Sequence, residues 1–250
     1  MSDQKRIALV TGGGRGIGRA IVERLAKDGF SVAFTYRENE TAAADLVAEL
    51  EARGHNAKAI CADIADIGKT PDMFDNVGAW GGGKDHGFLN VLVCSAGVIE
   101  HAPIDSIGPD FFDRVMSINA RGTFFTMQQG ARHMRDGGRM VCVSTIGTAW
   151  PSFGEAIYAA SKAAVEQFCR VASRELGARG ITVNSVSPGP TDTDLLRNQA
   201  SVADLDGVGA MTALGRIGKP EDIARVVSFL AGSDSGWVTG QNIVADGGLT

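Results

Sequence analysis

The sequence predicts an α/β protein in which a doubly wound sheet of seven parallel strands is flanked by helices. Short, continuous apolar runs alternate along the chain with longer stretches whose apolar residues recur at helical spacing. Continuous apolar runs are typical of parallel strands, because both faces of such strands are buried. No repeat, low-complexity segment or linker divides the 250 residues, so we expect one domain over residues 1–250.

Each predicted strand is a short apolar run that ends in small or polar residues. The strands are expected at 7–10, 31–36, 57–61, 91–93, 139–143, 181–186 and 242–244. The predicted helices share apolar residues at helical spacing and cover 19–28, 39–53, 110–135, 158–180 and 219–231. Glycines interrupt residues 67–90, so any helix there should be short, at about 71–77. Residues 192–217 carry few strong signals and are predicted to form a mobile flap over the substrate.

The composition excludes several classes of protein. The formal net charge is −5, without the basic stripe that nucleic-acid binding favours. No apolar run is long enough to span a membrane, and the first residues lack the apolar core of a signal peptide. The four cysteines are scattered, with no CxxC spacing and no histidine at metal spacing, which predicts reduced thiols and no metal site. These features predict a cytoplasmic protein.

A glycine-rich loop follows the first predicted strand and opens the first helix. Its spacing is Gly12-x-x-x-Gly16-x-Gly18, with Arg15 inside it and Ile17 where a strict GxGxxG string would have its last glycine. Glycines let the backbone approach a pyrophosphate, and the helix N-terminus offers it free N–H groups and a positive dipole end. This order predicts a dinucleotide-binding unit of the Rossmann type.

The end of the second strand bears on the choice of nucleotide. An acidic residue there would bind the ribose 2′-hydroxyl of NAD, but the chain has Arg37 there and a second cation, Arg15, in the loop. Two arginines favour a 2′-phosphate and hence NADP(H), against which Glu38 is the counter-indication. Asp63 ends the third strand, where it would bind the adenine amino group or cap a helix.

A tyrosine and a lysine four residues apart, Tyr158 and Lys162, share one face of a predicted helix. An ammonium beside a phenol favours the phenolate, so Lys162 is expected to lower the pKa of Tyr158 and prepare it for proton transfer. The alternative is a half-buried tyrosine packed on a lysine stem. Asn119 lies within another predicted helix, where a buried amide usually has a specific partner.

Taken together, the glycine-rich loop, Asn119, the Tyr158-x-x-x-Lys162 pair and Pro188-Gly189 resemble the short-chain dehydrogenase/reductase family. The resemblance covers nearly the whole chain and is strongest to the branch containing 3-oxoacyl-[acyl-carrier-protein] reductases. It implies an NADPH-dependent ketoreductase in which Tyr158 gives a proton to the substrate oxygen, Lys162 holds the nicotinamide ribose and Asn119 holds a water. It further assigns cofactor contacts to Ala96, Gly97, Pro188, Gly189, Thr191 and Thr193.

The hydroxyl that would orient the substrate carbonyl has two candidates in this family resemblance. The family places its serine thirteen residues before the tyrosine, a position held here by Thr145, whereas the glycine three residues later matches Gly147 only if Ser144 is that serine. We therefore expect Ser144, with Thr145 in reserve. The family's Asn-Asn-Ala-Gly turn is Cys94-Ser95-Ala96-Gly97 here, which alters the bonds that brace the central strands.

The substrate is expected to be a small-molecule or acyl-thioester ketone. An acyl carrier protein would require a basic rim, for which Arg132, Arg135 and Arg179 are candidates. The resemblance also implies a homotetramer that pairs helices 110–135 and 158–180 between subunits. Two alternatives stay open: an NAD-dependent secondary-alcohol or sugar dehydrogenase with the same tyrosine and lysine, and a nucleotide-binding regulator or scaffold without chemistry.

Overall fold

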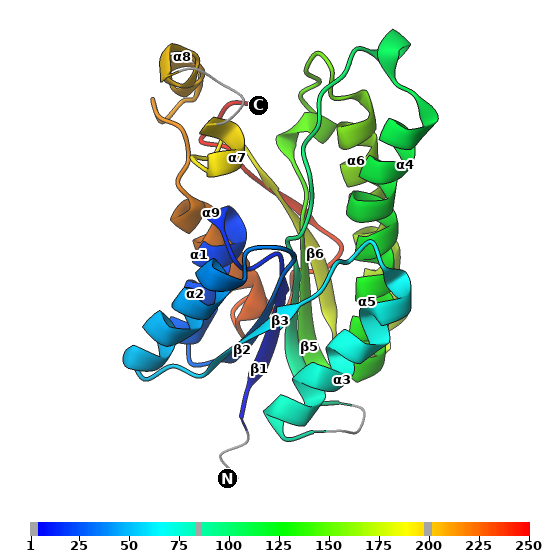
Figure 1. The fold of residues 1–250 in the computed structure, drawn as a ribbon, viewed down its shortest axis with the longest axis vertical. Coiled ribbons are helices and arrows are strands. Elements are labelled where there is room, and N and C mark those ends of the chain that lie inside the picture. Colours follow the sequence, from blue (N-terminus) through cyan, green and yellow to red (C-terminus); the bar gives the residue numbers. More distant parts are fainter. Residues whose placement is uncertain (1–4, 84–86, 198–201) are drawn as a thin grey trace.

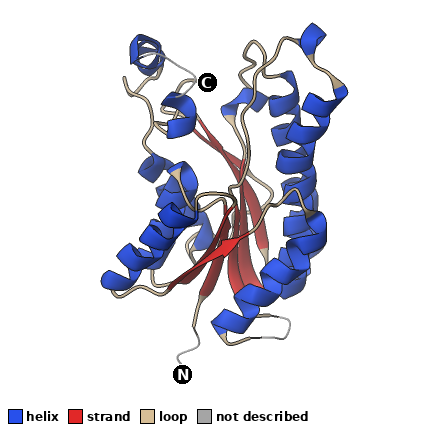
Figure 2. Ribbon diagram, in the orientation of Figure 1, coloured by secondary structure: helices blue, strands red, loops and turns tan. Residues whose placement is uncertain are grey.

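The computed structural model describes residues 5–83, 87–197 and 202–250 and contains a seven-stranded parallel sheet in the order β3-β2-β1-β4-β5-β6-β7. The strands are β1 Ile7–Thr11, β2 Ser31–Tyr36, β3 Ala57–Cys61, β4 Leu89–Cys94, β5 Met134–Val143, β6 Thr182–Pro188 and β7 Asn242–Ala245. The predicted fold class is therefore confirmed. Figure 2 shows the sheet between two layers of helix.

The helices of the described residues divide between the two faces of the sheet. They are α1 Gly16–Lys27, α2 Glu40–Ala52, α3 Thr70–Gly81, α4 Pro109–Met116, α5 Thr123–His133, α6 Ala156–Leu176, α7 Asp194–Arg197, α8 Val202–Met211 and α9 Pro220–Ala231. Helices α1, α2 and α9 lie on one side and α3, α5 and α6 on the other (Figure 1). The α7 and α8 helices lie beyond the carboxyl ends of the strands (Figure 1).

Alternation along the strands builds a separate apolar core on each face. In β1, Ala8 and Val10 pack into the core under α1, α2 and α9, whereas Ile7 and Leu9 pack into the core under α3, α5 and α6. All four side chains are at most 1% exposed. Burial on both faces is the reason that these strands are almost entirely apolar.

The strand order places a ligand site at one edge of the sheet. Strand β1 lies between β2 and β4, so the chain runs outward from β1 to β3 and then crosses to β4 on the other side. In doubly wound sheets, a crevice opens outside the carboxyl ends of the strands at such a reversal. The glycine-rich loop after β1 and the turn after β4 meet at this crevice.

The predicted single helix over residues 110–135 is wrong in two respects. The chain forms α4, then a π-helical segment, η3, over Ser117–Gly122, and then α5. The helix also ends at His133, and β5 begins directly at Met134. A π-helical segment shifts the residues that follow it around the helix axis. The sequence pattern does not reveal that shift, because apolar residues continue through it.

The prediction of a short helix within residues 67–90 is also wrong, since α3 spans twelve residues. Its glycines are packing contacts rather than breaks. A Cβ at Gly81 would lie 2.1 Å from Ile7 Cδ1, and one at Gly78 would lie 2.4 Å from the Gly83 carbonyl oxygen. The helix ends at Gly81, and the next residue, Gly82, has a φ of +83°, the left-handed conformation that favours glycine.

The segment predicted as a flap, residues 192–217, contains α7 and α8. Residues 198–201 lie outside the described part of the chain. An isolated parallel bridge joins Thr191 to Gly218, so the two ends of the segment are fixed side by side. Its mobility stays a prediction.

We predict that Gly122→Ala destabilises the fold by about 1–3 kcal/mol, as overpacking in a close contact does. Gly122 is buried in η3, and its Cβ would lie 2.5 Å from the Ile64 carbonyl oxygen, which belongs to the backbone. Urea unfolding of the purified variant measures the change. Gly177→Ala is the matched control, because no atom outside its own helical turn and chain neighbours lies within 4 Å of its Cβ position and its φ is −59°. Equal unfolding midpoints for the two variants would contradict the packing argument.

Candidate active site

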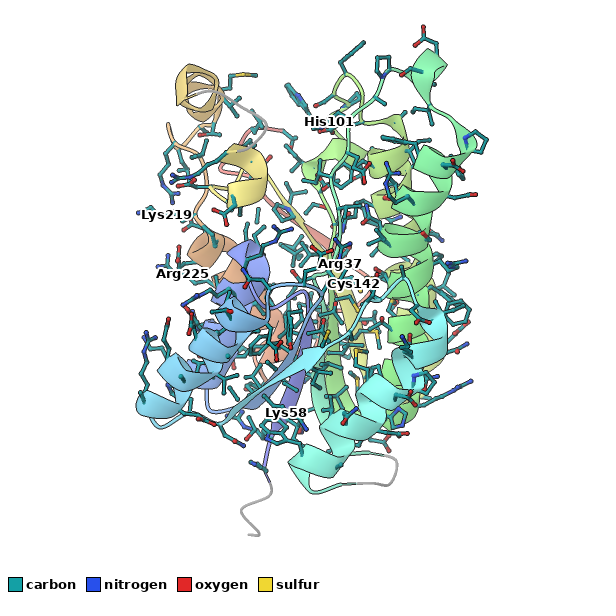
Figure 3. All side chains as sticks on the ribbon, viewed as in Figure 1. Arg37, Lys58, His101, Cys142, Lys219 and Arg225 are labelled. Carbon is teal, nitrogen blue, oxygen red and sulfur yellow. The ribbon has the colours of Figure 1, made fainter. Side chains whose placement is uncertain are left out.

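A cavity of about 980 Å³ lies at the carboxyl ends of the strands and includes most of the predicted site residues. Its walls come from the glycine-rich loop, the ends of β2 and β3, the turns after β4 and β5, the start of α6, and the segment after β6. All the predicted site residues line it except Asn119. Figure 3 places Arg37 and Cys142 near the middle of the molecule and His101 well beyond the strand ends.

The glycine-rich loop is held by contacts that only glycine permits. Gly12 has a φ of +68°, and its Cβ would lie 2.7 Å from Ala96 Cα. At Gly18, a Cβ would lie 2.1 Å from the Gly12 carbonyl oxygen. Helix α1 begins at Gly16, and Arg15 before it provides no side-chain cap. The first residues of α1 line the cavity, and no side chain caps their N–H groups, so these groups are available to bind an anion there.

The end of β2 supplies the predicted cation. The Arg37 side chain is 52% exposed, and its Nη2 atom forms an ion pair of 2.5 Å with Glu38 Oε1. Both residues and Arg15 line the cavity. The Glu38 carboxylate, which counts against NADP(H), is therefore paired with Arg37, which favours NADP(H). Asp63 is exposed, and its Oδ1 accepts from Ala65 N at 2.9 Å, a bond within its own turn and not a helix cap, since the next helical turn begins at Ile67 after Asp66.

The turn after β4 has a brace that sequence reasoning missed. Thr11 is 1% exposed, and its Oγ1 accepts from Ser95 N at 3.2 Å and from Ala96 N at 3.3 Å. One hydroxyl of β1 thus fixes the turn that carries Ala96 and Gly97. A buried threonine at the end of an apolar strand was the available signal.

Asn119 is fully buried and fixes the chain at the other side of this turn. Its Oδ1 accepts from Val98 N at 2.9 Å, and its Nδ2 donates to Val98 O at 2.9 Å and to Ser161 Oγ at 3.1 Å. It lies in η3, so the π-helical segment places this amide. A Cβ at Gly97 would lie 3.1 Å from Asn119 Oδ1 and 3.2 Å from Lys162 Nζ. The amide oxygen and the amine therefore converge on Gly97.

Lys162 is 5% exposed, and its Nζ donates to the Val143 carbonyl oxygen at 2.9 Å. Burial lowers the pKa of Lys162 to about 8, with Cys142 and Cys94 opposing the shift. Among the described residues, that carbonyl is the hydrogen-bond partner of the amine. Cys94, Cys142 and Cys169 are buried free thiols, as expected for reduced cysteines, whereas Cys61 is exposed.

The expected effect of Lys162 on Tyr158 is wrong for this structure. Burial raises the pKa of Tyr158 to about 12, a hydrogen bond with Thr145 lowers it, and the Glu155 carboxylate raises it. The tyrosine is 5% exposed, so desolvation of the phenolate dominates. Tyr158 is therefore protonated at neutral pH, which is the state that can donate a proton.

Ser144 and Thr145 both line the cavity, but their contacts favour Thr145, the reserve candidate, as the hydroxyl facing Tyr158. Ser144 Oγ is buried and donates to Glu166 Oε1 at 2.7 Å. Thr145, the reserve candidate, makes the hydrogen bond with Tyr158 and also accepts from Gly147 N at 3.1 Å through its Oγ1. Successive residues of an extended segment point to opposite sides, so only one of the two hydroxyls can face the tyrosine.

The segment after β6 closes the cavity beside the glycine-rich loop. Pro188 ends the strand, and Gly189 packs so closely on Asp246 that a Cβ would lie 2.6 Å from the Asp246 Cα. Thr191 Oγ1 donates to Gly189 O at 2.9 Å, and Thr193 Oγ1 accepts from Leu196 N at 3.3 Å. The Thr193 methyl carbon lies 3.3 Å from the Cβ position of Gly16. The structure therefore brings this segment to the loop, as expected.

Two carboxylates near the tyrosine were not predicted. Glu155 lines the cavity and contacts His101 Nε2 through its Oε1 at 3.0 Å. Glu166 lies one turn beyond Lys162 and is 6% exposed. The spacing of four residues between Tyr158, Lys162 and Glu166 was a signal for a shared helix face.

The proposed basic rim is not at the site. Arg135 lies at the start of β5 and Arg179 just before β6, at the amino ends of the strands. Arg135 Nε donates to Gly87 O at 2.6 Å, and Arg179 Nε pairs with Asp136 Oδ1 at 2.9 Å. Arg132, at the end of α5, lies at that same edge of the sheet. These arginines cannot rim a cavity at the opposite end.

Among the described residues, no group of three or more histidine, cysteine or acidic side chains is placed to hold a metal ion. No helix in the same part of the chain is long and apolar enough to cross a membrane.

The chain is similar in sequence to a known protein family and to named relatives. Residues 12–250 match the family model described as Enoyl-(Acyl carrier protein) reductase. The hydroxynaphthalene reductase-like protein Arp2 of Metarhizium brunneum is 38% identical over 97% of this chain and 94% of the relative.

Two solved structures share the fold over 98% of this chain. A short chain dehydrogenase from Burkholderia cenocepacia in complex with NADP has a TM-score of 0.91, 39% identity and 98% of its own chain covered. The landomycin C-6 ketoreductase LanV with bound NADP and rabelomycin has a TM-score of 0.88, 37% identity and 96% of its own chain covered. A family-model match over almost the whole length, together with these similarities, shows that the chain belongs to the short-chain dehydrogenase/reductase family of oxidoreductases.

Proposed function

We propose that this protein reduces a ketone to a secondary alcohol with NADPH, with Tyr158 as the proton donor. The observation that carries the proposal is the buried, protonated Tyr158 hydrogen-bonded to Thr145 beside a cavity that continues to the glycine-rich loop. A general acid must hold its proton at working pH until the substrate oxygen gains negative charge. Tyr158 meets that condition, because burial raises its pKa to about 12.

The other site residues have complementary roles in the proposal. When bound, NADPH supplies the hydride. Thr145 orients the substrate carbonyl and stabilises charge on its oxygen through its hydroxyl. Lys162 holds the nicotinamide ribose, and Asn119 places a water that returns the proton from solvent. Asn119 Oδ1 and Lys162 Nζ both lie against Gly97, which supports a shared proton path.

The cofactor contacts follow from the walls of the cavity. The N–H groups that begin α1 fit the pyrophosphate, with Gly12, Gly16, Ile17 and Gly18 giving the close approach. Arg15 and Arg37 bind the 2′-phosphate, and Asp63 lies at the adenine end. Ala96, Gly97, Pro188, Gly189, Thr191 and Thr193 enclose the nicotinamide half. The relatives crystallised with NADP support this choice of nucleotide.

For the substrate, we favour a ketone on a ring system over a linear 3-oxoacyl thioester. The cavity wall that includes Tyr158 also includes Ile99, Trp150 and Met211, and Trp150 is 43% exposed. The names of the hydroxynaphthalene reductase-like relative and of the ketoreductase with rabelomycin point to aromatic ring systems in those proteins. The displaced basic arginines remove the main reason to expect an acyl carrier protein.

We also propose that residues 1–250 act as one catalytic domain of a cytoplasmic homotetramer, with residues 192–217 as the substrate flap. Exposed apolar side chains on α4 and α5, among them Phe112 at 43% and Phe124 at 42%, support pairing of these helices between subunits. Sedimentation equilibrium of the purified protein tests the assembly.

Tyr158→Phe is predicted to lower turnover by about a hundredfold or more, since general acid catalysis contributes about 10²–10⁴-fold. NADPH should bind the variant with nearly unchanged affinity. The assay follows NADPH absorbance with a panel of ketones that includes tetralone and acetoacetyl-CoA. Turnover that survives the substitution would show that another group donates the proton, and a wild-type protein that binds NADPH but reduces nothing would favour a non-catalytic role.

The two neighbouring hydroxyls should differ in the same assay. We expect Thr145→Val to lower kcat by about a hundredfold, as loss of an oxyanion donor does. Ser144→Ala should cost less than tenfold, because its hydroxyl faces Glu166. The reverse order of the two effects would restore Ser144 to the catalytic role.

Arg37→Asp should shift the ratio of kcat/KM for NADPH over NADH by about tenfold to a hundredfold toward NADH. That range corresponds to the roughly 1.5–3 kcal/mol of a hydrogen bond to a charged group. Arg53→Asp, directly after α2, is the matched control, with a side chain 59% exposed. An unchanged ratio in Arg37→Asp would contradict the assignment of the 2′-phosphate site.

The affinity for NADPH should fall as the pH rises above about 8. Burial lowers the pKa of Lys162 to about 8, so the cationic amine is present below that pH and is lost above it. A titratable group of this kind changes affinity by up to about tenfold for each pH unit. Fluorescence titration of NADPH should show this trend in the wild type and in Lys58→Met but not in Lys162→Met. The titration covers about pH 6 to 10, roughly two units on either side of the lysine pKa. An identical trend in Lys162→Met would assign it to another group.

A further inference from the structure

Glu166 is a buried carboxylate on α6, the helix that carries Tyr158 and Lys162. It lies on α6 in register with Tyr158 and Lys162, at intervals of four residues, so all three occupy one face of the helix. All three are buried, with Glu166 only 6% exposed. A buried carboxylate is costly unless its oxygens accept hydrogen bonds, so its partners indicate why it is tolerated.

One oxygen of Glu166 accepts hydrogen bonds from hydroxyl groups that lie on both sides of Thr145 in the sequence. Ser144 Oγ donates to Glu166 Oε1 at 2.7 Å, and Thr148 Oγ1 donates to the same atom at 2.7 Å. Ser187, at the end of β6, lies 3.4 Å from it but is closer to Asn242, at 2.9 Å. The two short contacts therefore come from the turn between β5 and α6.

These contacts fix the turn that presents Thr145 to Tyr158. Ser144 directly precedes Thr145, and Thr148 follows it by three residues, so the same oxygen holds both ends of the segment. Within the turn, Thr148 Oγ1 also lies 3.0 Å from Thr145 O, and Gly147 N donates to Thr145 Oγ1 at 3.1 Å. Thr145 is thus held through its neighbours as well as through its own bonds.

We propose that Glu166 is a positioning residue for ketone reduction, whose Oε1 atom fixes residues 144–148 so that the Thr145 hydroxyl meets Tyr158. The proposal rests on the proposed function, because it concerns the placement of the hydroxyl that orients the carbonyl. Catalysis is sensitive to such placement, since an error of about 1 Å can cost about a hundredfold in rate. The other carboxylate oxygen, Oε2, lies 3.6 Å from Arg170 Nη2, a partly solvent-exposed cation.

The test compares Glu166→Ala, Glu166→Gln and the matched control Glu175→Ala, an exposed glutamate on the same helix. Turnover of tetralone is expressed per NADPH-binding site, counted by fluorescence titration, so that unfolded protein does not enter the rate. Glu166→Ala should lower kcat by about tenfold to a hundredfold, with the dissociation constant for NADPH changed less than about threefold. Glu166→Gln keeps an acceptor oxygen and should recover most of kcat.

A double-mutant cycle separates positioning from a general structural role. If Glu166 acts through Thr145, then Glu166→Ala should cost little in a Thr145→Val background, because the two effects are not independent. Additive losses would overturn the proposal, as would a wild-type kcat per site in Glu166→Ala or a Glu166→Gln variant no better than alanine. Should Glu166→Ala fail to fold, Thr148→Val removes one of the two short contacts and enters the same cycle.

A measurement that needs no substrate tests the role of Glu166 independently of the proposed function. Hydrogen–deuterium exchange of a peptide covering residues 144–148 should be at least about tenfold faster in Glu166→Ala than in the wild type, through local opening. Glu175→Ala should leave that peptide unchanged. Unchanged exchange in Glu166→Ala would overturn the role of Glu166 whatever the enzyme reduces, whereas a wild type that reduces no ketone would overturn only the function.

Discussion

The candidate site depends on the burial of three ionisable side chains along one face of α6. Tyr158, Lys162 and Glu166 lie one turn apart and are each at most 6% exposed. Burial favours the neutral forms of Tyr158 and Lys162, and this explains both the tyrosine pKa of about 12 and the lysine pKa of about 8. Each group is satisfied by a different neighbour: Tyr158 by Thr145, Lys162 by the Val143 carbonyl, and Glu166 by two hydroxyls.

Close backbone contact supports this arrangement from the other side of the cavity. Gly12 and Gly97 allow the glycine-rich loop, the turn after β4 and the α6 face to meet without side chains between them. Thr11 and Asn119 then supply the hydrogen bonds that hold the turn after β4 on both flanks. Rigidity comes from buried polar groups whose partners are all present, which is the condition for a polar network to strengthen a core.

The sequence predicted most of the fold because burial on both faces leaves a strong pattern. Strands β2 and β3 and helix α9 agree with their predicted bounds to within one residue. The two errors in the predicted helices came from features that the sequence pattern does not reveal: one leaves the hydrophobic periodicity intact, and the other looks like a helix break but is not one. The π-helical segment around Asn119 keeps its apolar neighbours, and the glycines of α3 are close contacts with Ile7 and Phe88 rather than helix breaks.

Residue types and their local spacing could be read directly from the sequence: the glycines after β1, the tyrosine and lysine one turn apart, and a pair of adjacent hydroxyls. The orientation of the two hydroxyls follows from the folded backbone, because its direction at the end of β5 turns Thr145 toward Tyr158 and Ser144 toward Glu166. The tertiary structure also reversed the expected pKa shift of Tyr158. Spacing shows that an amine is near, but burial and the amine's bond to the Val143 carbonyl depend on contacts between distant segments.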